Sequence, residues 1–137
     1  MAEKSLSEKM KLKGGMYAAV VNPPTGYLDQ LSAPRDVDIS QHLNTGPFDW
    51  VQVFVKSKAE LESLAPRLTK ALKPAAMLWI TFPKGTSKIQ TDLTRDKGWE
   101  ALQTLDLKWI NLISVNETWS AFALRPYKEG EARQSFR

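Results

Sequence analysis

The stretch from residue 48 to residue 82, FDWVQVFVKSKAELESLAPRLTKALKPAAMLWITF, decides the fold. It opens with Phe48 to Val55, a run dense in β-branched and aromatic side chains, as strands are. It closes with Ala75 to Phe82, which is apolar on both faces, as in a buried parallel strand. An amphipathic segment lies between the two runs. The stretch therefore predicts a β-α-β unit whose two parallel strands are adjacent and central.

The helix of this unit is predicted from its cap and its leucine spacing. Ser57 and Glu60 form a capping box, in which each side chain satisfies a backbone donor. The apolar stripe that follows consists of Leu61, Leu64, Leu68 and Leu72, which we expect to be buried together. Pro66 interrupts the stripe, so we expect a kink or a break near Ala65. Pro74 ends the helix.

Short elements precede and follow this unit. Those before it are a helix with a capping box at Ser5 and Glu8, a buried strand at Met16 to Val21, a short helix from Tyr27, and a short strand at Asp36 to Ser40. Those after it are a helix from Thr91 or Asp92 to near Asp106, carrying Trp99, Leu102 and Leu105, and two strands, Trp109 to Val115 and Thr118 to Leu124. Only Asn116-Glu117 separates the last two strands, which predicts an antiparallel hairpin. The expected fold is a three-layer, Rossmann-like α/β domain with a mostly parallel sheet.

This order of elements resembles the class I methyltransferase variant of the Rossmann-like fold. The run Leu72 to Ile80 is similar to the L-K-P-G-G-x-L-W-[VI] run that opens the fifth strand in those enzymes, with Ala75 and Ala76 in place of the two glycines. The resemblance implies a reduced version of the methyltransferase topology.

The chain resembles more closely a family of short bacterial proteins of unknown function that shares this reduced fold. The resembling residues are Asn22-x-Pro24-x-Gly26-Tyr27, the run from Leu72 to Lys84, Asp92-Leu93-Thr94-Arg95, Gly98-Trp99 and Thr118-Trp119-Ser120-Ala121. They spread over most of the chain from Met10 to Leu124. This resemblance implies the fold and a bacterial origin, but no activity.

Length and composition indicate one domain over residues 1–137, with an ordered core at about 5–126 and tails at 1–4 and 127–137. Cysteine is absent, and no run approaches the roughly 18 apolar residues of a membrane span. The N-terminus has no apolar signal core, so we expect a cytoplasmic protein.

The formal charge of +4 comes from the two ends of the chain, because acidic and basic side chains cancel between residues 14 and 124. Binding along phosphates needs cations clustered on the folded body. The charge count therefore favours a solubilising surplus, and nucleic-acid binding through the tails is the lesser alternative.

The loop after the first strand carries the main functional argument. Methyltransferases of this fold hold S-adenosylmethionine with a glycine-rich loop, whereas residues 22–26 here read Asn-Pro-Pro-Thr-Gly. Two prolines remove two backbone donors, so we expect no cofactor. Asp38 is a possible counterpart of the acid that ends the second strand and binds ribose, although an acid in a short strand is usually only solvated.

The carboxyl edge of the strands is the expected place for a ligand. The candidate ligand-binding residues are Asn22, Tyr27, Asp38, Lys84, Lys88 and Arg95. The cations follow the strand that ends at Phe82, next to a helix start, and could hold an anion. Asp92 and Asp96 oppose this, which favours a solvated loop with an Asp92 cap and an Arg95 ion pair.

Catalytic and metal sites are not indicated. His42 is the one histidine, lies in a polar loop, and is interpreted as a surface residue. Trp50, Trp79, Trp99, Trp109 and Trp119 fall on predicted strands and a helix stripe, so we interpret them as core residues and not as base-stacking platforms.

Two functions from different classes remain. The first is a non-catalytic binding or regulatory module that holds a partner protein or a small anion. The alternative is an enzyme or a nucleotide- or anion-binding protein that uses the carboxyl edge.

Overall fold

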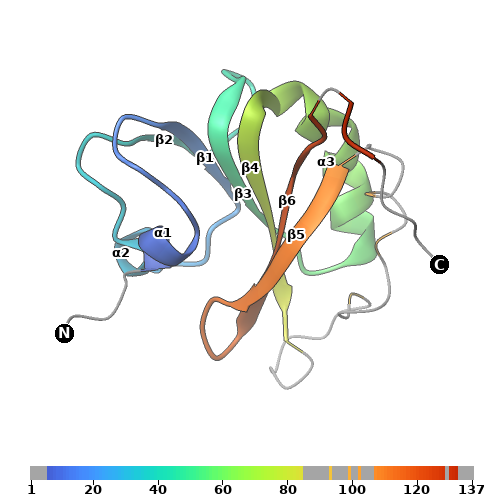
Figure 1. The fold of residues 1–137 in the computed structure, drawn as a ribbon. Coiled ribbons are helices and arrows are strands. Elements are labelled where there is room, and N and C mark those ends of the chain that lie inside the picture. Colours follow the sequence, from blue (N-terminus) through green and yellow to red (C-terminus); the bar gives the residue numbers. More distant parts are fainter. Residues whose placement is uncertain are drawn as a thin grey trace.

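The computed structural model describes residues 6–84, 93, 99, 102, 107–128 and 130–132, and Figure 1 shows helices on both sides of one sheet. The strands are β1 (Tyr17–Val21), β2 (Asp38–Ser40), β3 (Phe48–Phe54), β4 (Leu72–Pro83), β5 (Leu107–Ser114) and β6 (Trp119–Pro126). The helices are α1 (Leu6–Lys9), α2 (Tyr27–Leu31) and α3 (Lys58–Ala71). In the described residues, no helix is long and apolar enough to cross a lipid bilayer.

The six strands form one sheet in the order β2-β1-β3-β4-β6-β5. The pairs among β2, β1, β3 and β4 are parallel, and β6 runs antiparallel to both β4 and β5. The predicted mostly parallel sheet, with its adjacent central strands and one reversed strand, is therefore confirmed. Most side chains of β3 and of the second half of β4 are buried on both faces, as expected for parallel strands that are covered on both sides of the sheet.

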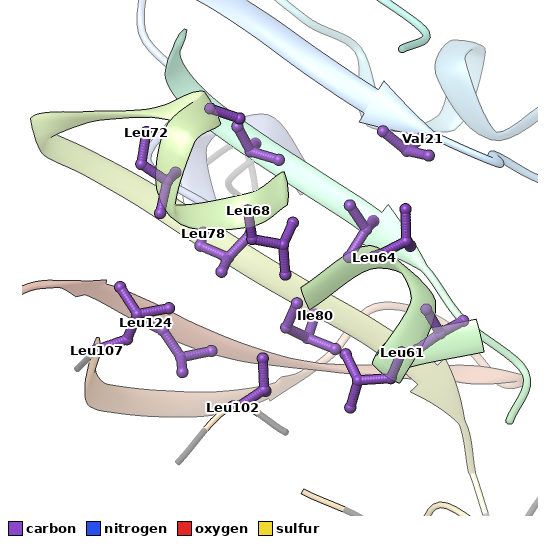
Figure 2. Close-up of a cluster of buried hydrophobic side chains, with 14 of the residues drawn as sticks. Val21, Leu61, Leu64, Leu68, Leu72, Leu78, Ile80, Leu102, Leu107 and Leu124 are labelled. Atoms are coloured by element: carbon purple, nitrogen blue, oxygen red, sulfur yellow. The ribbon is translucent and has the colours of Figure 1, made fainter. Parts of the chain in front are cut away.

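Helix α3 covers one face of the sheet and buries the leucine stripe. Figure 2 shows Leu61, Leu64 and Leu68 of α3 over the sheet residues Val21, Leu78 and Ile80. The four predicted leucines are at most 8% exposed, so their common burial is confirmed. Leu72 belongs to the start of β4, one residue after the helix ends.

The predicted helix cap is present, but the predicted break is not. Ser57 Oγ accepts from the Glu60 N–H at 3.2 Å, while Glu60 Oε1 accepts from the Lys56 N–H at 2.8 Å. The helix is assigned without interruption from Lys58 to Ala71, through Pro66. We expected a kink or a break near Ala65; the helix has no break there, because packing of the leucine stripe outweighs the loss of one backbone hydrogen bond.

The N-terminal segment and α2 cover the opposite face. Met10 and Leu12 follow α1 and are buried, together with Leu31 of α2. The carbonyl oxygen of Met10 accepts from the indole N–H groups of Trp50 at 2.7 Å and of Trp79 at 2.9 Å. This carbonyl therefore binds the segment to two neighbouring strands at once.

The last two strands form the expected hairpin, but its loop is longer than predicted. β5 ends at Ser114 and β6 begins at Trp119, so Val115 and Thr118 belong to the loop with Asn116-Glu117. Asn116 Oδ1 accepts from the N–H groups of Thr118 at 2.9 Å and of Trp119 at 3.0 Å. The asparagine side chain supplies the acceptor that a tighter turn would take from the backbone. Most of the predicted helix from Asp92 to Asp106 lies outside the described residues, although Trp99 and Leu102 are buried as expected.

Shortening one leucine of the stripe should destabilise the fold. Leu64 is 7% exposed, and Leu64→Ala should lower the free energy of unfolding by about 2 to 5 kcal/mol, as large-to-small core changes do. Ser63 is exposed on the same helix, and Ser63→Ala should change it by less than about 0.5 kcal/mol. Urea denaturation followed by circular dichroism measures both. Equal small effects would contradict the packing of α3.

Candidate functional site at the carboxyl edge of the sheet

The carboxyl ends of β1, β3 and β4 lie along one edge because the three strands are parallel neighbours. After β1 the chain moves outward to β2, and it then returns to the other side of β1 to form β3. The strand order therefore reverses between β1 and β3. Ligands of open α/β sheets bind outside the carboxyl ends at such a point.

The loop that follows β1 closes on itself. Asn22 has a positive φ of 57° and is exposed, and Gly26 has a φ of 81°, which glycine adopts without strain. The carbonyl oxygen of Pro24 accepts from the Tyr27 N–H at 3.0 Å. Pro23 and Pro24 carry no N–H, so this loop offers a ligand few backbone donors.

A small cavity of about 260 Å³ lies beside this loop. Its lining comes from the loop after β1, from the first turn of α2 and from the residue after β2: Pro23, Pro24, Thr25, Gly26, Leu28, Asp29 and Gln41. Pockets that bury small organic ligands usually hold about 300 to 1,000 Å³. The space is therefore below the usual size for a nucleoside-sized ligand.

Tyr27 points into the protein and not toward this cavity. Its side chain is 2% exposed, and its hydroxyl donates to Gln52 Oε1 at 2.6 Å. Gln52 Nε2 in turn donates to Thr81 Oγ1 at 2.9 Å, so a buried polar chain connects α2, β3 and β4. Burial raises the pKa of the Tyr27 hydroxyl well above its ordinary value, and the hydrogen bond with Gln52 offsets this only in part. The hydroxyl is a structural donor in this arrangement.

Three aromatic rings fill the space beneath the edge. The Tyr27 ring meets Phe54, the last residue of β3, with ring centroids 4.6 Å apart and edge to face. Phe54 meets Trp119, the first residue of β6, at 5.1 Å in the same geometry. All three residues are at most 5% exposed. Close-packed side chains therefore occupy the volume next to the end of β3.

The β5–β6 hairpin loop contacts α2. Asn116 Nδ2 donates to Gln30 Oε1 at 3.1 Å, which connects the loop to α2. The Lys84 N–H donates to the Thr118 carbonyl at 2.8 Å, and Lys84 Nζ donates to Ser114 Oγ at 2.6 Å. Lys84 thus lies at the carboxyl edge as predicted, with its ammonium group hydrogen-bonded to the hairpin.

The remaining candidates are placed differently. Asp38 opens β2 instead of ending it and pairs with Tyr17 at the start of β1, so it lies toward the amino edge. The strand expected at Asp36 to Ser40 begins at Asp38 in the structure, so Asp38 does not have the strand-end position of a ribose-binding acid. Asn22 and Lys84 share the carboxyl edge but follow β1 and β4, with β3 between them. Lys88 and Arg95 lie outside the described residues.

One residue in the sequence indicates the buried polar chain, although the sequence analysis did not predict it. Gln52 is a polar residue in the middle of an apolar strand, and it is fully buried. Buried amides need partners, so such a residue predicts a hydrogen-bonded neighbour. The identity of that neighbour, Tyr27, follows only from the fold.

Solved structures of methyltransferases are similar to this chain. A SAM-dependent methyltransferase from Aquifex aeolicus matches with a TM-score of 0.61 and 14% identity over 85% of each chain. The ribosomal protein L11 methylase from Lactobacillus delbrueckii subsp. bulgaricus matches with a TM-score of 0.61 and 13% identity, over 89% of this chain and 75% of the other. The [4+2]-cyclase SpnF matches with a TM-score of 0.60 and 13% identity, over 90% and 79%.

No protein-family model and no curated protein matches the sequence. Identities this low show a shared fold, and the fold by itself does not transfer an activity. The chain has a Rossmann-like fold of the methyltransferase type.

Removing the Tyr27 hydroxyl should destabilise the protein. Tyr27→Phe leaves the buried Gln52 oxygen without its donor, which should lower the free energy of unfolding by about 1 to 3 kcal/mol. The control is Tyr17→Phe, whose hydroxyl bonds Thr45 in an exposed setting and whose loss should change little. Chemical denaturation of the two variants measures the difference, and equal values would contradict the structural role of the Tyr27 hydroxyl.

The same hydroxyl should make stability depend on alkaline pH. The unfolded chain ionises Tyr27 near its ordinary pKa of about 10, while the folded protein keeps it neutral to higher pH. Unfolding then releases a proton, so this contribution is complete below pH 10 and falls as the pH rises further. Wild-type stability should decrease more steeply than that of Tyr27→Phe above pH 10, as urea midpoints at several pH values would show. Parallel curves would exclude this linkage.

Proposed function

We propose that this chain is a non-catalytic binding module with a methyltransferase-like fold that does not hold S-adenosylmethionine. The observation that carries the proposal is the aromatic filling of the carboxyl edge, where Tyr27, Phe54 and Trp119 pack ring against ring. A cofactor laid across the end of β3 would have to displace side chains that are at most 5% exposed.

The loop after β1 supports the same proposal. Glycine-rich loops bind cofactors closely because their backbone approaches the ligand and donates N–H groups. Pro23 and Pro24 donate none, and the Tyr27 N–H is used by the Pro24 carbonyl. A module of this kind would hold a partner protein or a small anion.

A second candidate is an enzyme or a nucleotide- or anion-binding protein that uses the same edge. The cavity of about 260 Å³ beside Pro24 and Gln41 favours it, because the space would admit a small ligand. The similar structure of SpnF carries the name of a [4+2]-cyclase, so this kind of fold is also found in a protein named for a reaction other than methyl transfer.

Calorimetric titration with S-adenosylmethionine tests the first proposal. We expect no saturable heat at micromolar concentrations, because the proline loop and the aromatic rings leave the cofactor no site. The Aquifex aeolicus methyltransferase, titrated in the same buffer, is the positive control. Saturable one-to-one binding would contradict the proposal, and its loss in Asn22→Ala would assign the site to the loop after β1.

A thermal-shift screen over nucleotides and small anions separates the two candidates. A ligand present at 100 times its dissociation constant stabilises the folded state by about 2.7 kcal/mol. A shift that Gln41→Ala removes would favour a ligand at the carboxyl edge.

A further inference from the structure

The segment after β6 turns back onto the amino edge of the sheet, opposite the site described above. Figure 1 shows this segment in dark red at the end of β6. Its Glu131 returns to β6 and β5 and accepts hydrogen bonds from two cationic side chains, Arg125 and Lys108. Glu131 and Arg125 are six residues apart in the sequence, so a short segment connects the two side chains.

The Glu131 carboxylate accepts four hydrogen bonds, two at each oxygen. Oε1 accepts from Arg125 Nη1 at 2.9 Å and from the Lys128 N–H at 2.9 Å. Oε2 accepts from Arg125 Nη2 at 2.8 Å and from Lys108 Nζ at 2.7 Å. The parallel pair of Arg125 bonds is the geometry by which arginine recognises carboxylates. These donors hold the pKa of Glu131 far below its usual range.

A cavity of about 550 Å³ adjoins this cluster. Its lining residues are Pro74, Ala75, Arg125, Tyr127 and Lys128. β4 begins at Leu72, but its pairing with β6 begins only at Leu78, and the cavity lies where the two strands separate. Its size falls within the usual range of about 300 to 1,000 Å³ for small-ligand sites.

Arg125 belongs to both the carboxylate cluster and the cavity wall. Proline and alanine side chains and a tyrosine ring make much of the remaining wall apolar, and Lys128 also lines the cavity. An apolar pocket with a few convergent polar groups is the usual form of a binding site. A ligand that placed an apolar body in the cavity could therefore reach the Arg125 guanidinium with an acidic group.

We propose that Arg125, Lys108 and the Lys128 N–H form a binding site for a carboxylate carried by an apolar body, and that Glu131 occupies this site when the ligand is absent. The inference rests on the proposed binding function and names a site and a ligand class for it. Glu131 acts as an internal competitor, because a short tether gives it an effective concentration of about millimolar. Replacing Glu131 should therefore uncover the affinity of the site.

The test compares the wild-type protein with Glu131→Gln, using phenylacetate as the probe in calorimetric or NMR titrations. Glutamine keeps the size of the side chain and removes the negative charge that competes for Arg125. We expect Glu131→Gln to bind phenylacetate at least about tenfold more tightly, since the binding-competent state is no longer a minor population. The control Glu117→Gln removes an acid from the hairpin loop at the opposite edge and should bind as the wild type does.

The recognising group is tested with a second substitution in the uncovered protein. Adding Arg125→Lys to Glu131→Gln keeps the positive charge but loses the paired donors, and should abolish most of the gain. 2-Phenylethanol, which has the ring but no carboxylate, should not bind. An N-acetylated tripeptide that ends in Phe, compared with its C-terminal amide, distinguishes a peptide C-terminus from a free small acid as the source of the carboxylate.

Equal, weak phenylacetate binding in the wild type, Glu131→Gln and Glu131→Ala, with each variant folded by circular dichroism, would overturn the inference and leave Glu131 as a tether of the C-terminal segment. Binding that survives Arg125→Lys would overturn it as well. Binding of S-adenosylmethionine to the wild-type protein would overturn the proposed function without affecting the result with phenylacetate.

Discussion

One carbonyl oxygen, that of Met10, receives two indole N–H groups, and the arrangement of a whole face of the sheet depends on it. Trp50 and Trp79 lie on neighbouring strands, so their shared acceptor fixes the N-terminal segment across both strands. Ser7 Oγ then donates to the carbonyl of Ser32 at 2.9 Å, which connects α1 with the end of α2. The position of α2 determines where Tyr27 meets Gln52 and Phe54. The packing of Tyr27 at the carboxyl edge is thus connected, through α2 and α1, to the hydrogen bonds of the Met10 carbonyl on the face of the sheet.

Local patterns were sufficient for the central β-α-β unit. The continuous apolar run of β3, the Ser57 cap and the leucine spacing of α3 each act over a few residues, so the sequence displays them directly. Pro66 shows the limit of this reasoning, because a local rule predicted a kink or a break and tertiary packing kept the helix unbroken. The hairpin was correct in direction, but its loop length depended on the side chain of Asn116, which no spacing rule describes.

The candidate site could be predicted only in part. The proline loop after β1 is visible in the sequence because proline acts on its own backbone. Tyr27 and Gln52 are 25 residues apart, and Lys108 and Glu131 are 23 apart, so neither pair follows from periodicity. The start of β2 at Asp38, and not at Asp36, could not be predicted for a related reason, since the ends of a three-residue strand are set by its neighbours and not by its own pattern.

The place of β6 in the sheet has a consequence for how the chain assembles during synthesis. Of the strands that the structure describes, β6 comes last in the sequence, yet it lies between β4 and β5 and pairs with both. Until β6 leaves the ribosome, β5 has no neighbour through which to join the sheet, and β4 presents an unpaired edge. Chains generally fold from the N-terminus as they emerge, so β5 and β6, two of the six described strands, can join the sheet only after β6 has been made. Unpaired edges invite pairing with other chains, which makes the interval before β6 is inserted the period of greatest exposure to aggregation.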